Sequence, residues 1–251
     1  MMGIHIYGDS KQAGIESGKQ GARFIREAIT NRGSANIILA TGTSQFETLN
    51  QLRSENIDWS KVCLFHLDEY IDLPVTHPAS FRNYLIARFI SKVKDLKAVY
   101  LINGEAQPAE ECIRLSKLII EHPIDVAFVG IGENGHLAFN DPPADFDTNE
   151  PYIVVELNEA CRRQQMGEGW FADLSAVPGK AISMSVKQIM KSTKIICTVP
   201  DSRKAEAVKN SLENAVSNLF PATILQEHPD CHYYFDRSSA ALLSNQSHQV
   251  L

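Results

Sequence analysis

The strongest constraint on the fold is the alternation of short apolar runs with segments of helical period along nearly the whole chain. The segment Ser202–Glu213, for example, carries its apolar residues on one helical face. This alternation predicts a single α/β domain over residues 1–251, with a mostly parallel sheet and helices on both faces. Ligands of such sheets bind at the carboxyl ends of the strands, so functional residues are expected directly after strands. The expected strands are Ile4–Tyr7, Asn36–Ala40, Val62–His66, Ala98–Leu101, Asp125–Gly130, Ile153–Glu156, Ala181–Met184, Lys194–Val199 and His232–Phe235.

Charge and composition exclude several classes of partner. The chain has 24 Lys and Arg against 30 Asp and Glu, and its basic residues are scattered, so we expect no nucleic-acid partner. No apolar run approaches the roughly 18 residues that span a bilayer, which predicts no membrane segment. The five cysteines form neither a C-x-x-C motif nor a Cys/His cluster at zinc-ligand spacing, and they are typical of reduced thiols in the cytoplasm.

Two segments after expected strands carry candidate site residues. Thr41, Gly42, Thr43 and Ser44 follow an apolar run and open a helical pattern, which suits a bound phosphate. The alternative for these four residues is an ordinary capped turn. Their spacing fits neither a dinucleotide site nor an ATP site.

The acid pair Asp68 and Glu69 follows the next apolar strand. Adjacent acids in a partly dry cleft raise the pKa of a carboxyl toward that of a useful base. A solvated acid pair on a loop is the alternative.

The segment after Val126–Val129 is the most specific in the chain. It reads GIGENGHLAFNDP, in which three glycines in six residues indicate a tight turn that presents His136. Asn134, Asn140 and Asp141 are candidate partners that orient the imidazole. Because no second His lies nearby at ligand spacing, acid–base work is favoured over a metal site. A structural His in a capped loop is the alternative.

The fourth segment places Arg203 and Lys204 in the first turn of a helix after a strand. Cations at that position oppose the helix dipole, which indicates a bound anion beside them. A surface helix that tolerates this small penalty is the alternative. Residues 143–178, the least regular stretch, are expected to form a mobile lid.

In their order and spacing, the four segments resemble the glucosamine-6-phosphate deaminase/isomerase family, whose superfamily includes the 6-phosphogluconolactonases. The resemblance runs from Leu39 to Lys204 and is strongest in FHLDEYIDLPVTHPASFRNYL and GIGENGHLAFNDP. Tyr70 and the Gly-His-Leu-Ala-Phe-Asn run favour the deaminase branch over lactonases, which typically show Asp-Glu-Arg and Gly-His-Thr. The resemblance implies a Rossmann-like fold and conversion of glucosamine 6-phosphate and water into fructose 6-phosphate and ammonia, with no metal or cofactor.

The resemblance also implies roles for individual residues. Asp68 corresponds to the base that moves a proton between C2 and C1 through an enolamine. His136, oriented by Asn134 and Asp141, corresponds to the residue that opens the pyranose ring by moving a proton between O1 and O5. The phosphate ligands are expected to be Thr41, Gly42, Thr43, Ser44 and Lys204, and the remaining substrate-binding candidates are Glu69, Gly132 and Gly135.

The chain departs from the family pattern at three places. Asp141 stands where the family usually has Glu, so its side chain is one methylene shorter. Gly169 occupies the place of the family's second phosphate ligand, an Arg before two aromatic residues, so Arg162 or Arg163 is expected to substitute. Residues 143–150 lack the basic residues that hold an effector phosphate in regulated hexameric members, and we expect that regulation to be absent.

Three other functions compete with glucosamine-6-phosphate deamination. The shortened Asp141 and the altered lid leave open another amino-sugar phosphate, such as galactosamine 6-phosphate. Activation of water by His136 would instead give a 6-phosphogluconolactonase. A non-catalytic sugar-phosphate sensor would not need a base beside the reacting carbon. In each case the expected partner is a small sugar phosphate, and a homo-oligomer is left open.

Overall fold

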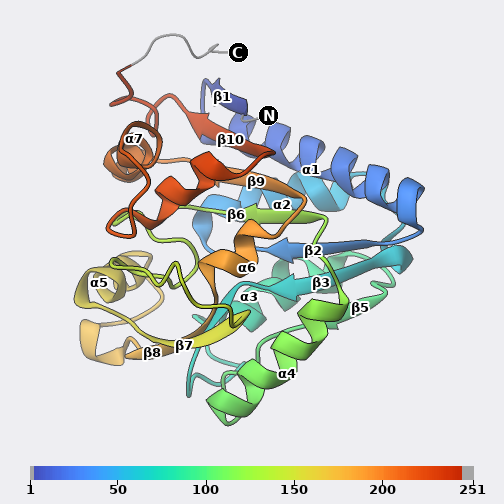
Figure 1. Cartoon of the computed structure of the whole chain (residues 1–251), viewed down its shortest axis with the longest axis horizontal. Coiled ribbons are helices and arrows are strands. Elements are labelled where there is room, and N and C mark those ends of the chain that lie inside the picture. Colours follow the sequence, from blue (N-terminus) through green and yellow to red (C-terminus); the bar gives the residue numbers. More distant parts are fainter. Residues whose placement is uncertain (1–2, 245–251) are drawn as a thin grey trace.

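The computed structural model describes residues 3–244 and places seven strands in one parallel sheet, in the order β1-β10-β9-β6-β2-β3-β5 (Figure 1). Each of these strands coincides with one of the apolar runs in the sequence, so the expected parallel sheet is confirmed. The strands are β1 (Gly3–Tyr7), β2 (Ala35–Leu39), β3 (Val62–His66), β5 (Ala98–Tyr100), β6 (Val126–Val129), β9 (Lys194–Val199) and β10 (Cys231–Asp236).

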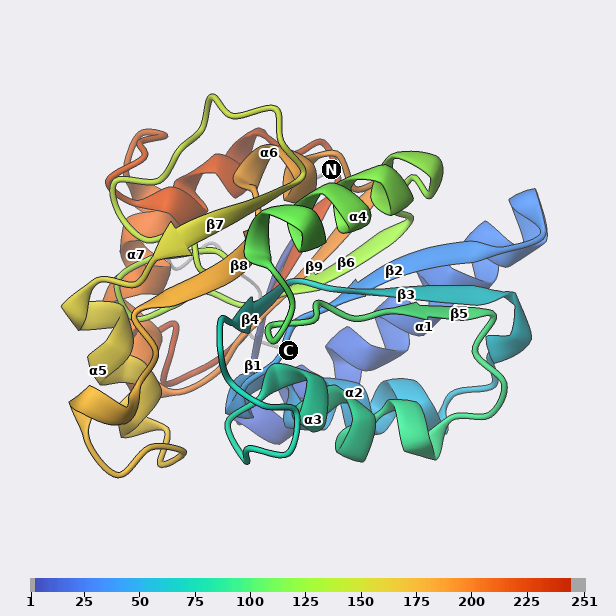
Figure 2. The same ribbon diagram turned by 90° about the horizontal axis from the view of Figure 1, so that it is seen from below.

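Helices cover both faces of this sheet, as Figure 2 shows. Alternate residues of a strand point to opposite faces. In β6, accordingly, Val126 and Phe128 pack in one apolar core and Ala127 and Val129 in another. The first core lies under α1 (Ser10–Arg32), α2 (Phe46–Ser54) and α3 (Phe81–Arg88), and the second under α4 (Pro108–Glu121), α6 (Val186–Met190) and α7 (Ala205–Glu213).

A second, antiparallel sheet was not expected from the sequence. Its order is β4-β8-β7, with β4 (Asp68–Tyr70), β8 (Lys180–Met184) and β7 (Tyr152–Glu156). The expected strands Ile153–Glu156 and Ala181–Met184 do form, but they belong to this sheet and not to the parallel one. The helix α5 (Glu159–Gly167) between them makes the segment read as a parallel βαβ unit. Alternate residues of β7 are exposed, which is typical of an antiparallel strand and not of a strand in a parallel βαβ unit.

The shortest connection between the two sheets is a single residue, because β3 ends at His66 and β4 begins at Asp68. Residues 143–178 are more regular than expected, since they contain β7 and α5. Within residues 3–244, no helix combines the length and apolar character needed to cross a bilayer. Short 3-10 turns lie at Thr43–Gln45, Trp59–Lys61, Ile90–Lys92, Leu174–Ala176, Ser202–Lys204 and Pro221–Glu227.

Glycines on α1 allow α2 to pack unusually close. A Cβ atom built on Gly18 would lie 2.8 Å from the carbonyl oxygen of Thr48 and 2.7 Å from Cβ of Gln51. One built on Gly14 would lie 2.4 Å from Cβ of Glu47. Because α2 follows the segment after β2, this contact sets the position of residues 41–44.

Replacing Gly18 with Ala should therefore destabilise the protein. Alanine favours a helix interior over glycine by about 1 kcal/mol, but forcing a methyl group against the Thr48 backbone costs about 1–3 kcal/mol. We expect a lower urea midpoint for Gly18→Ala. The matched control is Gly167→Ala, because a Cβ there meets no atom within 4 Å. Equal midpoints for the two variants would contradict the close-packing interpretation.

Candidate active site

A cavity of about 520 Å³ lies at the carboxyl ends of the central strands. Its walls include the segments after β2, β3, β6 and β9, which are brought together by the strand order β9-β6-β2-β3. Four stretches that are distant in sequence thus meet at one edge of the sheet, as the strand-end rule predicts. Eight of the candidate site residues line the cavity: Thr41, Gly42, Thr43, Ser44, Asp68, Gly132, His136 and Lys204.

The Thr41–Ser44 segment forms a supported loop at one end of the cavity. Gly42 has a φ of +96°, a backbone conformation that favours glycine. The Tyr84 hydroxyl donates a hydrogen bond of 2.8 Å to the Gly42 carbonyl oxygen. The side-chain amide of Gln45 donates hydrogen bonds to Ser44 Oγ at 3.1 Å and to the Thr198 carbonyl oxygen at 3.2 Å. These bonds fix the loop with its hydroxyl groups beside the cavity.

Lys204 provides a buried positive charge in the same cavity. The residue is 7% exposed, and burial lowers the pKa of its ammonium group, whereas the nearby carboxylates of Glu133 and Glu168 act to raise it. Among the residues that the structure describes, the ammonium has no hydrogen-bond or ion-pair partner. A buried cation without a direct partner favours binding of an anion.

Arg203, the other cation that the sequence placed beside an expected anion, also lines the cavity. Its guanidinium lies 3.0 Å from the carboxylate of Asp201 and 3.4 Å from that of Glu133. Asp201 has a φ of +89°, a strained conformation for a residue with a side chain. Its N–H donates to the buried carboxylate of Asp236 at 3.3 Å, which helps to hold this turn against the cavity.

A carboxylate occupies the place where the sequence predicted a lid arginine. Glu168 lines the cavity, and a Cβ atom built on Gly42 would lie 3.8 Å from Glu168 Oε2. Burial raises the pKa of Glu168, and the positive charges of Lys204 and Arg203 act against that rise. The end of the cavity that holds Lys204 and the Thr41–Ser44 loop therefore also contains an acid of the protein itself.

The arginines proposed for this position do not reach the cavity lining. Arg162 donates hydrogen bonds to the carbonyl oxygens of Leu174 and Val177, and so holds the 3-10 turn after α5. Arg163 pairs with Glu159 on the exposed side of α5. Neither arginine lines the cavity, so the structure gives no support to the expectation that Arg162 or Arg163 completes a phosphate site.

Asp68 lies where the chain leaves the parallel sheet, and its carboxyl group faces the cavity. Burial, together with the charge of the neighbouring Glu69, raises the pKa of Asp68 to about 8. The residue is only 7% exposed. When it is ionised, a carboxylate with this raised pKa is a far stronger base than a solvated carboxylate, which is the effect expected for an acid pair in a partly dry cleft.

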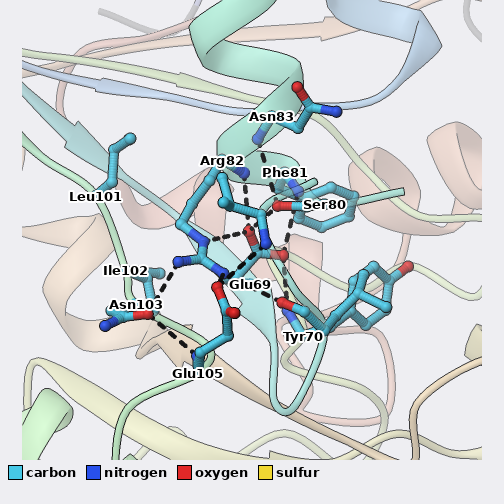
Figure 3. Close-up of polar contacts among 12 residues, drawn as sticks. Glu69, Tyr70, Ser80, Phe81, Arg82, Asn83, Leu101, Ile102, Asn103 and Glu105 are labelled. Atoms are coloured by element: carbon cyan, nitrogen blue, oxygen red, sulfur yellow. Dashed lines mark hydrogen bonds and ion pairs between the residues drawn. The ribbon is translucent and has the colours of Figure 1, made fainter. Parts of the chain in front are cut away.

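Glu69, in contrast, does not line the cavity, and Figure 3 shows its carboxylate beside Ser80, Phe81 and Arg82. Its carboxylate accepts hydrogen bonds from the N–H groups of Phe81 at 3.1 Å and Arg82 at 2.8 Å, and from Ser80 Oγ at 2.9 Å. It thus caps the first turn of α3 and pairs with the Arg82 side chain. The prediction that Glu69 contacts the substrate is wrong, because these partners occupy both carboxylate oxygens.

The glycine-rich loop holds the imidazole of His136 against the cavity. A Cβ on Gly132 would lie within 2.4 Å of the ring, so glycine is required there. Asn134 Oδ1 accepts a hydrogen bond of 3.1 Å from the His136 N–H, and its amide donates to Asp141 Oδ1 at 3.1 Å. Gly135 has a φ of +84° and shapes the turn without lining the cavity, which corrects its placement among substrate contacts.

Asp141 is long enough to reach His136. Its Oδ1 lies 3.2 Å from His136 Nδ1, an ion-pair distance, although the ring nitrogen lacks a well-aligned hydrogen bond. Burial acts to raise the pKa of Asp141, but the contacts with His136 and Asn134 outweigh it, and the pKa lies below its ordinary value. The acid thus stays ionised and can orient the imidazole.

The structure adds residues that the sequence did not identify. Gln164, Gln165 and Glu168 reach the cavity from α5 and its end, and the polar run Arg-Arg-Gln-Gln was the available signal. Cys161 of α5 forms a group with His136 and Asp141, whose ligating atoms lie within 4.8 Å of one another and could hold a metal ion. No local spacing indicated this group.

Comparisons with known proteins agree with this geometry. A family model described as glucosamine-6-phosphate isomerases/6-phosphogluconolactonase matches residues 9–233. A glucosamine-6-phosphate deaminase of Bacillus cereus (strain ATCC 10987 / NRS 248) is 34% identical over 230 residues, which are 91% of this chain and 86% of the relative. A homologue of the same name from Bacillus anthracis (strain A0248) matches equally well.

Solved structures agree too. A monomeric glucosamine-6-phosphate deaminase has a TM-score of 0.86 and 30% identity, over 95% of this chain and 99% of that chain. The 6-phosphogluconolactonase from Trypanosoma brucei shares the fold, with a TM-score of 0.80 and 16% identity over 97% of this chain and 99% of that chain. The chain therefore belongs to the glucosamine-6-phosphate isomerase/6-phosphogluconolactonase family.

Proposed function

We propose that this protein is a glucosamine-6-phosphate deaminase, which converts glucosamine 6-phosphate and water into fructose 6-phosphate and ammonia. The observation that carries the proposal is the meeting of Asp68 and His136 in one cavity, whose other end has the Thr41–Ser44 loop and Lys204. A general base, a proton shuttle and an anion site are the three elements that this reaction needs. The deaminase names of the relatives and of the solved structure support the same choice.

In the proposed mechanism, His136 first moves a proton between O1 and O5 and opens the sugar ring. The ionised Asp141 keeps the imidazole oriented during this step. Asp68 then removes the C2 proton beside the C1 carbonyl and returns it to C1, passing through an enolamine. The resulting C2 imine takes up water and releases ammonia. The raised pKa of Asp68 makes it basic enough for this transfer near neutral pH.

The phosphate group is proposed to lie between the Thr41–Ser44 loop and Lys204. Arg203 lines the same end of the cavity as Lys204 and is proposed as the second cation that binds the phosphate, in place of Arg162 or Arg163. The α5 segment within residues 143–178 is proposed to act as the lid. We also propose a cytoplasmic location, which the five free thiols support, because a reducing compartment keeps thiols unpaired.

The deaminase proposal is tested by ammonia release from glucosamine 6-phosphate, with galactosamine 6-phosphate and 6-phosphogluconolactone assayed in parallel. We expect turnover of the gluco epimer with a kcat/KM above those of the other two substrates. Asp68→Asn should lower kcat by roughly 100- to 10,000-fold, the usual contribution of a positioned base. Asp58→Asn makes the same chemical change at an exposed, distant site and should leave kcat unchanged.

Each other outcome of that assay has a definite meaning. Lack of ammonia from either amino sugar would refute the deaminase function. A higher kcat/KM for the galacto epimer would assign the enzyme to that substrate. Hydrolysis of the lactone alone would make the protein a lactonase, and tight binding without turnover would make it a sensor.

Asp68→Asn should also stabilise the protein as it inactivates it. The folded protein holds the Asp68 proton up to about pH 8, whereas the unfolded chain releases it near pH 4. The Asp68 contribution to stability is therefore present below about pH 4 and is lost as the pH rises toward 8. In urea unfolding, the variant should gain nothing at pH 4 and several kcal/mol at pH 9, because each unit of pKa shift corresponds to about 1.4 kcal/mol. A stability difference independent of pH would contradict the buried-base interpretation.

Glu168→Gln should lower KM for the sugar phosphate by about 3- to 10-fold with little change in kcat, because it removes a negative charge beside the anion loop. The decrease in KM relative to the wild type should grow as the pH rises through the raised pKa of Glu168, because the wild-type acid becomes charged there. Glu159→Gln, an exposed acid on the same helix, is the control and should leave KM unchanged. A rise in KM for Glu168→Gln would instead mean that this carboxylate binds the substrate.

A further inference from the structure

His136, Asp141 and Cys161 form a compact set of nitrogen, oxygen and sulfur donors beside the cavity. Their ligating atoms lie within 4.8 Å of one another, and His136 Nδ1 lies 3.2 Å from Asp141 Oδ1. Zinc binds such atoms at about 2.0–2.3 Å in a tetrahedral arrangement, so two ligands of one ion lie roughly 3.3–3.7 Å apart. Small shifts of these side chains would therefore bring all three into coordination distance.

An unpartnered buried atom points to the same site. His136 Nδ1 is buried and has no hydrogen-bond partner, even though the side chain is 9% exposed and Asp141 lies next to it. Buried polar atoms without partners are uncommon in folded proteins and call for an explanation. A metal ion between Nδ1, the Asp141 carboxylate and the Cys161 sulfur would give that nitrogen a partner.

The surrounding structure holds two of the three ligands in place. Asp141 Oδ2 accepts a hydrogen bond of 3.2 Å from the Asn158 N–H, and Asn158 Oδ1 accepts one of 2.8 Å from the Cys161 N–H. These bonds connect the Asp141 carboxylate to the backbone at the start of α5, where Cys161 lies. On the other side, the Asn134 amide donates to Asp141 Oδ1. Such supporting bonds orient ligands and strengthen metal sites.

We propose that His136, Asp141 and Cys161 form a site for a thiophilic divalent metal ion, with Zn²⁺ as the best match, and that its occupation inhibits the enzyme. The donor set excludes Mg²⁺ and Ca²⁺, which prefer oxygen ligands, whereas thiolate and imidazole suit zinc. Three protein ligands leave the fourth position for water. The Cys161 thiol loses its proton when the ion binds, so one proton is released per ion.

Inhibition follows from the nitrogen that the ion occupies, and this step depends on the proposed function. An ion bound to Nδ1 excludes a proton from that atom, so the proton of the neutral ring lies on Nε2. The imidazole can then no longer accept a proton from the sugar, and ring opening stops. Because His136 lines the cavity, the ion reaches the site through the opening that the substrate uses.

The site is tested on the whole, chelator-treated protein with Co²⁺ as a spectroscopic probe and Zn²⁺ as competitor. We expect about one equivalent of Co²⁺ with a thiolate-to-cobalt charge-transfer band, which Zn²⁺ abolishes. Cys161→Ser, with Cys161→Ala as a second variant should the first fail to fold, should lose this band. Cys112→Ser removes a partly buried thiol outside the group and should keep it.

Inhibition is measured separately, relative to the metal-free rate of each variant. The Zn²⁺ concentration for half-inhibition should rise at least about tenfold in Cys161→Ser, and a chelator should restore wild-type activity. Absence of a Cys161-dependent band would overturn the site, whatever substrate the enzyme uses. A Cys161-dependent band with unchanged turnover would overturn its inhibitory role. Failure of every substrate in the ammonia assay would refute the proposed function but leave the spectroscopic result decisive for the site.

Discussion

The order of the central parallel strands is the constraint on which the site depends. Because β9, β6, β2 and β3 lie side by side with the same direction, the segments that follow them must share one edge of the sheet. None of these segments is a binding site alone. Together they surround a cavity with a buried carboxyl group, an imidazole and a buried cation, which lie more than sixty residues apart along the chain.

Two neighbouring carboxylates illustrate how strand geometry assigns different tasks. Asp68 and Glu69 are adjacent in β4, so their side chains point to opposite sides of the strand. Asp68 enters the cavity, and Glu69 caps α3. Glu69 also raises the pKa of Asp68 through its charge, although burial contributes more. The structural acid thereby assists the acid that faces the cavity.

The sequence predicted the strands of the parallel sheet and the residues that follow them. Both predictions use only short stretches of sequence, because an apolar run marks a strand and ligands bind directly after the carboxyl end of a parallel strand. The sequence did not predict the orientation of α5. The pattern of β7, α5 and β8 fits a parallel unit, and only pairing with β4 shows that the segment folds into a second sheet. The residues that α5 and its end bring to the site, Cys161 and Glu168, were therefore not predicted.

The separation of the two sheets has an evolutionary consequence. Most of the proposed proton-transfer and anion-binding residues come from loops of the parallel sheet, whereas Gln164, Gln165 and Glu168 come from the segment between β7 and β8. Substitutions in that segment can change one wall of the cavity without moving the parallel strands. The architecture thus lets substrate preference diverge among descendants while the reaction itself is inherited.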